Sequence, residues 1–167
     1  PHIDSRPSGL LDPDQARVLA RPDLSVPVWD IDNAAAVLVL DTDLVEEAPI
    51  LDLRVRKARR RNGVKVVVAS SQPTALDSNA TEVVRFPPGG VEATLRDLAD
   101  NAHLRKGPVV VVWGERLSHG ERGRHGVAAL LALAKKLNLQ GTEGAGLLEI
   151  PSGTNSRGLR EVGCLPN

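Results

Sequence analysis

Short runs of apolar residues, each bounded by Gly, Pro, Asp or Ser, recur along this chain and predict its strands. Three runs, at 36–40, 64–69 and 109–113, are almost continuously apolar and rich in Val and Leu. Strands of this kind are buried on both faces, as in parallel sheets. Two weaker runs, at 82–86 and 147–150, predict a fourth strand and a possible fifth.

A helical pattern follows the first strand. Residues 46–62 place Leu51, Val55 and Ala58 on one stripe, with an acidic start and a basic end. This polarity complements the helix dipole, and Gly63 suits the position just after a helix. The segment therefore predicts one amphipathic helix.

Further helical patterns separate the later strands. Apolar repeats predict helices over 91–104 and 125–138, and Asp12 followed by Pro13 predicts the start of a short helix over 12–20. Strands that alternate with helices indicate βαβ units with right-handed crossovers. We expect a three-layer, doubly wound, mostly parallel α/β sheet of the Rossmann or flavodoxin-like type.

The length of 167 residues fits a single α/β domain over 1–167. Residues 1–30 are expected to be an irregular lead-in. Residues 151–167 are rich in Gly and predict a loop that packs on missing parts. Met is absent, even at position 1, and the simplest interpretation is an excised piece of a larger chain.

Composition narrows the function classes. Lys and Arg number 21, as do Asp and Glu, and this balance argues against a nucleic-acid partner. The one cysteine, Cys164, excludes a disulfide framework or a multi-cysteine metal site within the chain. The apolar runs fall far short of the ~20 residues that span a bilayer, so we expect no direct membrane insertion.

Ligands of open parallel sheets bind beyond the carboxyl ends of the strands. The loops there supply the candidate residues for any cofactor: Asp41, Thr42, Asp43, Ser70, Ser71, Gln72, Gly89, Gly90, Glu92 and Gly114. No G-x-G-x-x-G follows the first strand, and carboxylates stand where a phosphate needs bare N–H groups. We therefore expect filled, acidic pockets at this edge, with no cofactor, catalytic residue or metal ligand.

Other interpretations of single motifs stay open. Asp41 and Asp43 could form a metal or acid–base pair, although their spacing better fits capping of the following helix. Residues 120–126, with Gly and Arg before a helix, could cradle an anion or form a flexible loop. The basic run at 54–61 indicates a solvated face or a protein–protein surface.

Several segments of the chain follow one another in the same order as in a known protein family. They are the strand, loop and "E-A-P" at 36–58, Gly114 at a strand end, the helix at 127–139, N-S-R-G at 155–158 and V-G-C-L-P at 162–166. Together, over residues 30–167, they resemble the molybdopterin-oxidoreductase superfamily. Within it, the chain is similar to the large iron–sulfur subunits of NADH-quinone oxidoreductase, respiratory complex I.

The resemblance carries implications for cofactors. Members that hold a molybdopterin dinucleotide typically show G-x-N, D-P-R and P-G-T-D in three loops, and residues 41–43, 69–72 and 88–92 depart from these. The departures match the large complex I subunit, whose corresponding domain is a scaffold without the molybdenum cofactor. The resemblance also implies that the iron–sulfur clusters lie elsewhere in the parent.

The resemblance further implies a parent that passes electrons from NADH through iron–sulfur clusters to quinone. This segment would be a non-catalytic scaffold in the cytoplasmic, peripheral arm of the membrane-bound complex. Its partners would be other domains of the same subunit and other complex I subunits. Two alternatives remain: a fragment of an active molybdopterin enzyme such as a formate dehydrogenase, and a small anion- or nucleotide-binding module.

Overall fold

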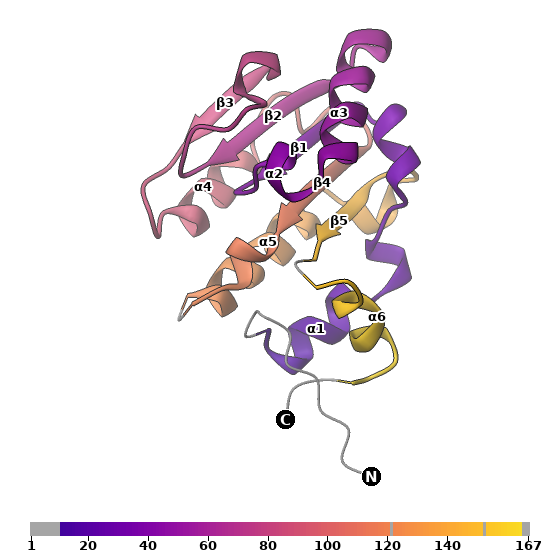
Figure 1. The fold of residues 1–167 in the computed structure, drawn as a ribbon, viewed down its shortest axis with the longest axis vertical. Coiled ribbons are helices and arrows are strands. Elements are labelled where there is room, and N and C mark those ends of the chain that lie inside the picture. The colour runs from indigo at the N-terminus through magenta and orange to yellow at the C-terminus, as the bar shows by residue number, and fades with distance from the viewer. Residues whose placement is uncertain (1–10, 121, 152, 165–167) are drawn as a thin grey trace.

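The centre of the molecule is a five-stranded sheet (Figure 1), seen in a computed structural model that describes residues 11–120, 122–151 and 153–164. All strand pairs are parallel, in the order β3-β2-β1-β4-β5. The predicted parallel α/β fold is confirmed, including the fifth strand. The strands are β1 Ala36–Leu40, β2 Lys65–Ser70, β3 Glu82–Arg85, β4 Val109–Gly114 and β5 Gly146–Ile150.

The strand order sets a topological switch point. From β1 the chain moves to β2 and then to β3 on one side, and it returns to the other side of β1 with β4. Leu40 of β1 therefore pairs with Ala69 of β2 and with Trp113 of β4. The gap between the carboxyl ends of β1 and β4 is the place where ligands of such sheets bind.

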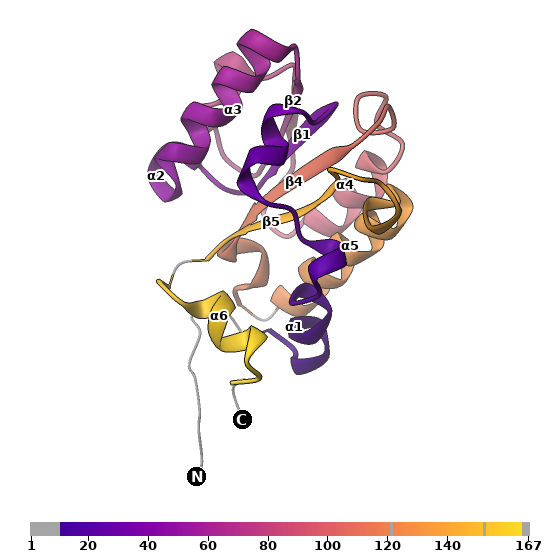
Figure 2. The same ribbon diagram turned by 90° about the vertical axis from the view of Figure 1, so that its right-hand side faces the viewer.

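Helices cover both faces of the sheet, as Figure 2 shows, with α3 on one side and α4 and α5 on the other. The α-helices are α1 Pro13–Leu19, α2 Leu44–Glu47, α3 Pro49–Asn62, α4 Val91–Leu98, α5 Gly123–Lys136 and α6 Ser156–Glu161. Short 3-10 helices are η1 Pro22–Leu24, η2 Val28–Asp32, η3 Asp77–Asn79, η4 Glu115–Ser118 and η5 Leu139–Gly141. The molecule therefore has the three layers that the sequence predicts.

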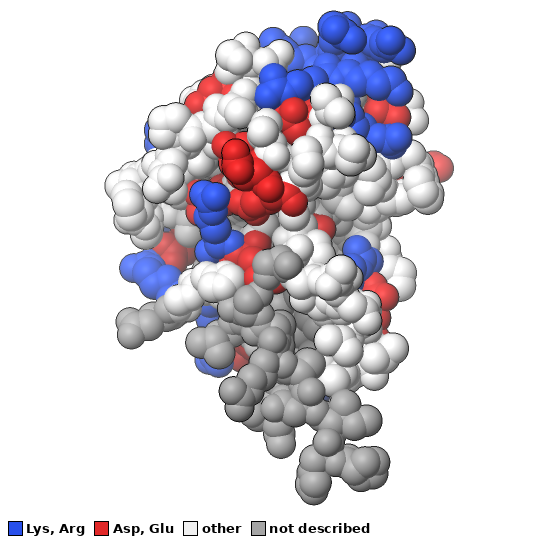
Figure 3. Space-filling view, in the orientation of Figure 1, with Lys and Arg blue, Asp and Glu red and all other residues white. Residues whose placement is uncertain are grey.

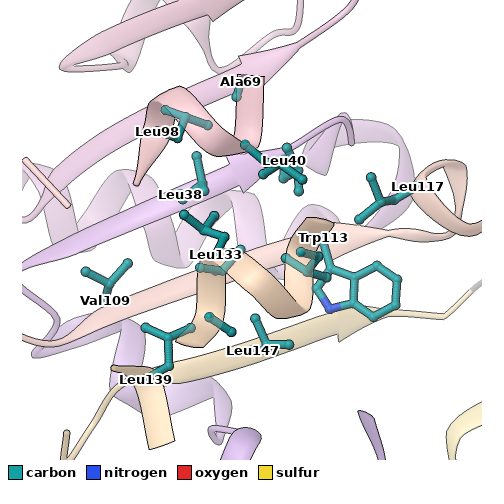
Figure 4. Packing of buried hydrophobic residues seen from close by; sticks show 14 of the residues in the cluster. Leu38, Leu40, Ala69, Leu98, Val109, Trp113, Leu117, Leu133, Leu139 and Leu147 are labelled. Carbon is teal, nitrogen blue, oxygen red and sulfur yellow. The ribbon is translucent and has the colours of Figure 1, made fainter. Parts of the chain in front are cut away.

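Alternate strand residues feed two separate cores. Leu38 and Leu40 join the core under α4 and α5, whereas Val37 and Val39 join the core under α3. Figure 4 shows the first core, where Trp113 lies among aliphatic side chains from the strands and α5. Each fully buried Val, Leu or Ile side chain contributes about 1.5–3 kcal/mol of transfer free energy.

The helix predicted over 46–62 is interrupted in the structure. It divides into α2 and α3 at Ala48, whose φ of −154° is not helical. Pro49 occupies the first turn of α3. Because proline has no N–H and restricts the residue before it, the chain restarts a helix there. The predicted end is confirmed, since Gly63 caps α3 with a φ of 73°.

The helix predicted over 91–104 is shorter in the structure. It ends at Leu98, and the side chain of Asn101 then accepts a hydrogen bond from the His103 N–H at 2.9 Å. A local side-chain bond of this kind competes with helical backbone bonds. Leu104 is still buried. The apolar repeat therefore predicts its burial correctly, but it wrongly predicts that the helix continues to this residue.

Near both ends of the chain, the described residues contain more regular structure than predicted. Asp12 caps α1 as expected, by accepting from the Asp14 N–H at 2.9 Å, and Ser25 forms a parallel bridge with Leu147. The lead-in over 1–30 is therefore not irregular in its described part. The predicted loop over 151–167 contains α6, which contacts α1. Residues 1–10 and 165–167 lie outside the described residues, and packing on missing parts stays a prediction.

Candidate functional site at the carboxyl edge of the sheet

The carboxylate of Glu47 lies at the switch point between β1 and β4. Its Oε2 accepts a hydrogen bond from the buried Thr42 hydroxyl at 2.8 Å. Its Oε1 accepts from the Asp43 N–H at 3.4 Å and pairs with the Arg116 guanidinium at 3.1 Å. At Gly114, a Cβ atom would stand 2.7 Å from Oε2. The protein's own anion therefore occupies the space where β1 and β4 diverge.

Asp41 joins the ends of β1 and β2. Its Oδ1 accepts from the Ser71 N–H at 3.2 Å and from the Ser71 hydroxyl at 3.0 Å. The backbone of Asp41 has a φ of 46°, a left-handed conformation that aspartate tolerates better than most residues. Asp41 thus fixes the two loops against each other and caps no helix, which corrects part of the capping interpretation.

Asp43 is the N-cap of α2, as its spacing predicts. One carboxylate oxygen accepts from the Val45 N–H at 3.1 Å, and the other accepts from the Ala75 N–H at 3.4 Å. In the neighbouring loop, the buried Ser70 hydroxyl accepts from the Gln72 N–H at 3.2 Å. Figure 3 shows the acidic side chains that gather on this face over α2. The backbone N–H donors of these loops are therefore largely bound to the protein's own oxygens.

An open cleft of about 460 Å³ lies beside the switch point. Its lining includes Asp41, Ser71, Gly89, Arg116, His119 and Arg122. The expectation of filled, acidic pockets is therefore wrong for this part of the edge, because the sequence does not reveal that η4 and the start of α5 bring cations here. At the switch point itself, the Glu47 carboxylate fills the space beside Gly114.

The basic groups around the cleft are bound internally. Arg122 pairs with both carboxylate oxygens of Glu92 at 2.9 Å, and these hydrogen bonds hold the pKa of Glu92 below its ordinary value. Arg116 pairs with Glu47, and His119 Nδ1 lies 2.7 Å from the Glu115 carbonyl oxygen. Each of the two arginines therefore already has a carboxylate of the protein as its counter-charge.

In the described part of the loop over 120–126, two glycine N–H groups donate within the protein. The Gly123 N–H donates to the Gly120 carbonyl at 3.1 Å, and the Gly126 N–H donates to the Arg122 carbonyl at 3.0 Å. A Cβ at Gly123 would stand 2.0 Å from the Ser118 carbonyl oxygen. The glycine at this position therefore permits close packing of the helix start on η4.

Most predicted site residues meet at this edge, but the structure adds others. Asp41, Thr42, Asp43, Ser71 and Gly114 surround the switch point, and Ser70 and Gln72 lie in the next loop. Gly89 lines the cleft, Gly90 is the N-cap of α4 and Glu92 follows in its first turn. Sequence reasoning missed Glu47, and it did not predict that Arg116, His119 and Arg122 line one cleft. A carboxylate next to an "A-P" pair is visible in the sequence, but its reach across to β4 is not.

The described residues offer neither a metal site nor a membrane span. Within ranges 11–120, 122–151 and 153–164, no group of three or more His, Cys, Asp and Glu side chains is placed to hold a metal ion. Across the same ranges, no helix has the length and apolar character needed to cross a bilayer.

Comparison with known proteins identifies one family and several related subunits. Residues 14–166 match the molybdopterin oxidoreductase family. The chain is 33% identical over 155 residues to the G subunit of NADH-quinone oxidoreductase from Mycobacterium tuberculosis, and the match covers 90% of this chain and 18% of that protein. The corresponding protein of Streptomyces coelicolor is 30% identical over 154 residues, covering 85% and 17%.

A relative with another electron acceptor also matches. The alpha subunit of NADPH-Fe(3+) oxidoreductase from Geobacter sulfurreducens is 28% identical over 193 residues, covering 86% of this chain and 23% of that protein. The chain thus spans about a fifth of the length of these curated relatives.

Proposed function

The chain belongs to the molybdopterin oxidoreductase family, and on that premise we propose that it is a structural domain within the G subunit of an NADH-quinone oxidoreductase. The parent would pass electrons from NADH through iron–sulfur clusters to quinone, and this domain would contribute no redox centre. The observation that carries the proposal is the Glu47 carboxylate at the switch point, held by Thr42, Asp43 and Arg116.

The residues at this edge do not fit a molybdopterin dinucleotide. Its pyrophosphate would need free N–H donors and a neutral or positive surrounding. Here Asp41, Asp43 and Glu47 place three carboxylates at the loop after β1 and its helix, where like charges would repel the phosphates. The Ser71 and Asp43 N–H groups already donate to two of these carboxylates. These contacts support a scaffold in which side chains close the ligand site.

The proposed scaffold would contact other domains of its own subunit and other subunits of the complex, in the cytoplasmic peripheral arm. Two surfaces are candidates for these contacts. One is the basic face of α3, and the other is the segment from Gly153 onwards, which includes α6. In α6, Leu159 is 36% exposed, and Val162 just after the helix is 80% exposed. Exposed apolar side chains of this kind mark surfaces that a neighbour can cover.

Metal analysis of the purified full-length parent tests the proposal against the alternative of an active molybdopterin enzyme. We expect iron in cluster stoichiometry without molybdenum, together with co-purification of other NADH-quinone oxidoreductase subunits. A formate dehydrogenase purified by the same procedure serves as the positive control for molybdenum retention. Stoichiometric molybdenum in the parent would overturn the proposal and support the enzyme alternative.

A further inference from the structure

The solvent side of α3 changes character along its length. Val55 and Ala58 are buried on the opposite side, against the sheet. Near the start of the helix, Ile50 is 73% exposed and Leu53 is 63% exposed. Exposed cations follow towards its end. Large apolar side chains beside cations, both in solvent, form a surface typical of a contact with another polypeptide.

A groove of about 570 Å³ lies at the basic end of this surface. The cations that line it are Arg56, Lys57, Arg59, Arg60 and Lys65. We call this site the basic groove. Leu53 and Val64 add apolar surface to it, Gly63 and Asn79 complete the lining, and the lining contains no carboxylate. Figure 3 shows the Lys and Arg side chains that gather at this end of α3.

The cations of the basic groove have different partners. Arg56 donates to Asp52 at 2.7 Å and to the Ala75 carbonyl at 2.9 Å, and Arg59 donates to the Thr81 hydroxyl. These bonds fix two of the cations as part of the fold. In contrast, the side chains of Lys57, Arg60 and Lys65 have no hydrogen-bond or ion-pair partner among the described residues. Three exposed cations therefore repel one another without a local counter-charge.

The basic groove is also distinct from the candidate ligand site. It lies at the end of α3 and the start of β2, whereas the switch point lies at the carboxyl ends of β1 and β4. In Figure 1, the end of α3 and the carboxyl ends of β1 and β4 lie at opposite ends of the strands. The whole chain has 21 acidic and 21 basic residues, so an acid-free basic groove is a local concentration of charge.

We propose that the basic groove docks an acidic polypeptide segment of the surrounding assembly, whose carboxylates pair with Lys57, Arg60 and Lys65. An apolar side chain of the same segment would cover Leu53. This inference rests on the proposed function, because it names the chemistry of one contact of the scaffold. Charge complementarity of this kind fixes orientation and excludes wrong partners more than it adds affinity.

A polypeptide fits the basic groove better than a nucleic acid or a lipid surface. Single-stranded nucleic acids need aromatic rings for base stacking, and the lining contains none. Double-stranded nucleic acids favour proteins with a net basic charge, and this chain has a net charge of zero. A concave site of this volume accepts projecting side chains, whereas a membrane presents a flat layer of headgroups.

Carbodiimide cross-linking of the assembled parent complex tests the proposal directly. The reagent activates a carboxyl group, a lysine amine displaces the urea, and an amide forms only where the two groups touch. We expect Lys57 or Lys65 to link to an Asp or Glu outside the described domain. We also expect both lysines to resist acetylation in the complex, relative to the exposed Lys106, Lys135 and Lys136.

Two other results would overturn the proposal. One is free acetylation of Lys57 and Lys65, equal to that of the three control lysines, with no amide link. The other is protection that nuclease or detergent treatment removes, because this would identify a nucleic acid or a lipid as the occupant. Metal content and subunit co-purification test the proposed function separately. A negative cross-linking result with the expected metal content would therefore contradict only the docking proposal.

A charge-reversal pair sharpens the test. In Lys57→Glu/Arg60→Glu, we expect the yield of the Lys65 cross-link to fall about tenfold, since like charges then face each other. Lys135→Glu/Lys136→Glu carries the same charge change on exposed residues at the end of α5, and it should keep the parental yield. An unchanged Lys65 yield in the Lys57→Glu/Arg60→Glu variant would contradict the proposal.

Discussion

At the scale of single residues, Glu47 decides what the carboxyl edge can do. It is exposed in part, yet its two oxygens contact Thr42, Asp43 and Arg116 at once. Thr42 is almost fully buried, so its hydroxyl depends on this carboxylate as acceptor. The same side chain therefore holds the loop after β1 and places a negative charge at the switch point.

Replacing Glu47 should measure how much its contacts stabilise the 167-residue chain. We expect Glu47→Ala to lower the free energy of unfolding by about 1–2 kcal/mol, because the buried Thr42 hydroxyl loses its acceptor. Glu47→Gln retains an acceptor oxygen and should lose less. The neighbouring Glu46→Ala is the control and should stay within about 0.5 kcal/mol of the parent. Urea denaturation gives all three values, and a Glu47→Ala chain as stable as the parent contradicts this role.

Part of this site is accessible to sequence reasoning. The capping role of Asp43 follows from its place before a helix, and the position of Asp41 after β1 puts it at the edge. The pairing of Arg122 with Glu92 is not accessible, because it joins residues 30 positions apart through side-chain conformations alone. Candidate residues on the strand ends can be predicted, whereas the groups that satisfy them cannot.

At the scale of elements, burial is easier to predict than helix length. The strands β1, β2 and β4 are buried along almost their whole length, and their continuous apolar runs indicate this. The end of α4 and the break before α3 depend on local competition, at Asn101 and at Pro49, that an apolar repeat does not show. In α6, the Gly-rich sequence indicates a loop, although Arg157 and Glu161 are spaced for a helical ion pair and form one at 2.7 Å.

The junction of η4 and α5 provides a test at this scale. Gly123→Ala would place a Cβ 2.0 Å from the Ser118 carbonyl oxygen, and backbone atoms would have to move. We expect a loss of about 3 kcal/mol in unfolding free energy, as for other overpacked sites. His125→Ala alters an exposed residue of the same helical turn and should cost less than about 0.5 kcal/mol. Chemical denaturation compares the two, and equal stability of both variants would show that the close contact is not required.

At the scale of the whole molecule, the two edges of the sheet have different roles. The carboxyl edge keeps the switch-point geometry of a ligand-binding fold, but Asp41, Asp43 and Glu47 engage its donors. The opposite edge carries the basic groove, with three cations that have no partner among the described residues. An occupied ligand site together with an open charged surface is the arrangement expected of a scaffold domain, whose role is to bind neighbouring domains and subunits.

Titration of the 167-residue chain with GTP, NADH, FAD and inorganic phosphate, followed by the melting temperature, tests the closed ligand site most directly. A ligand that binds only the native state must raise the melting temperature as its concentration exceeds its Kd. We predict no shift at micromolar concentrations of any nucleotide. A dose-dependent rise with micromolar nucleotide, reduced by changes to residues 41–43 or 70–72, would contradict the closed site and the scaffold role that depends on it.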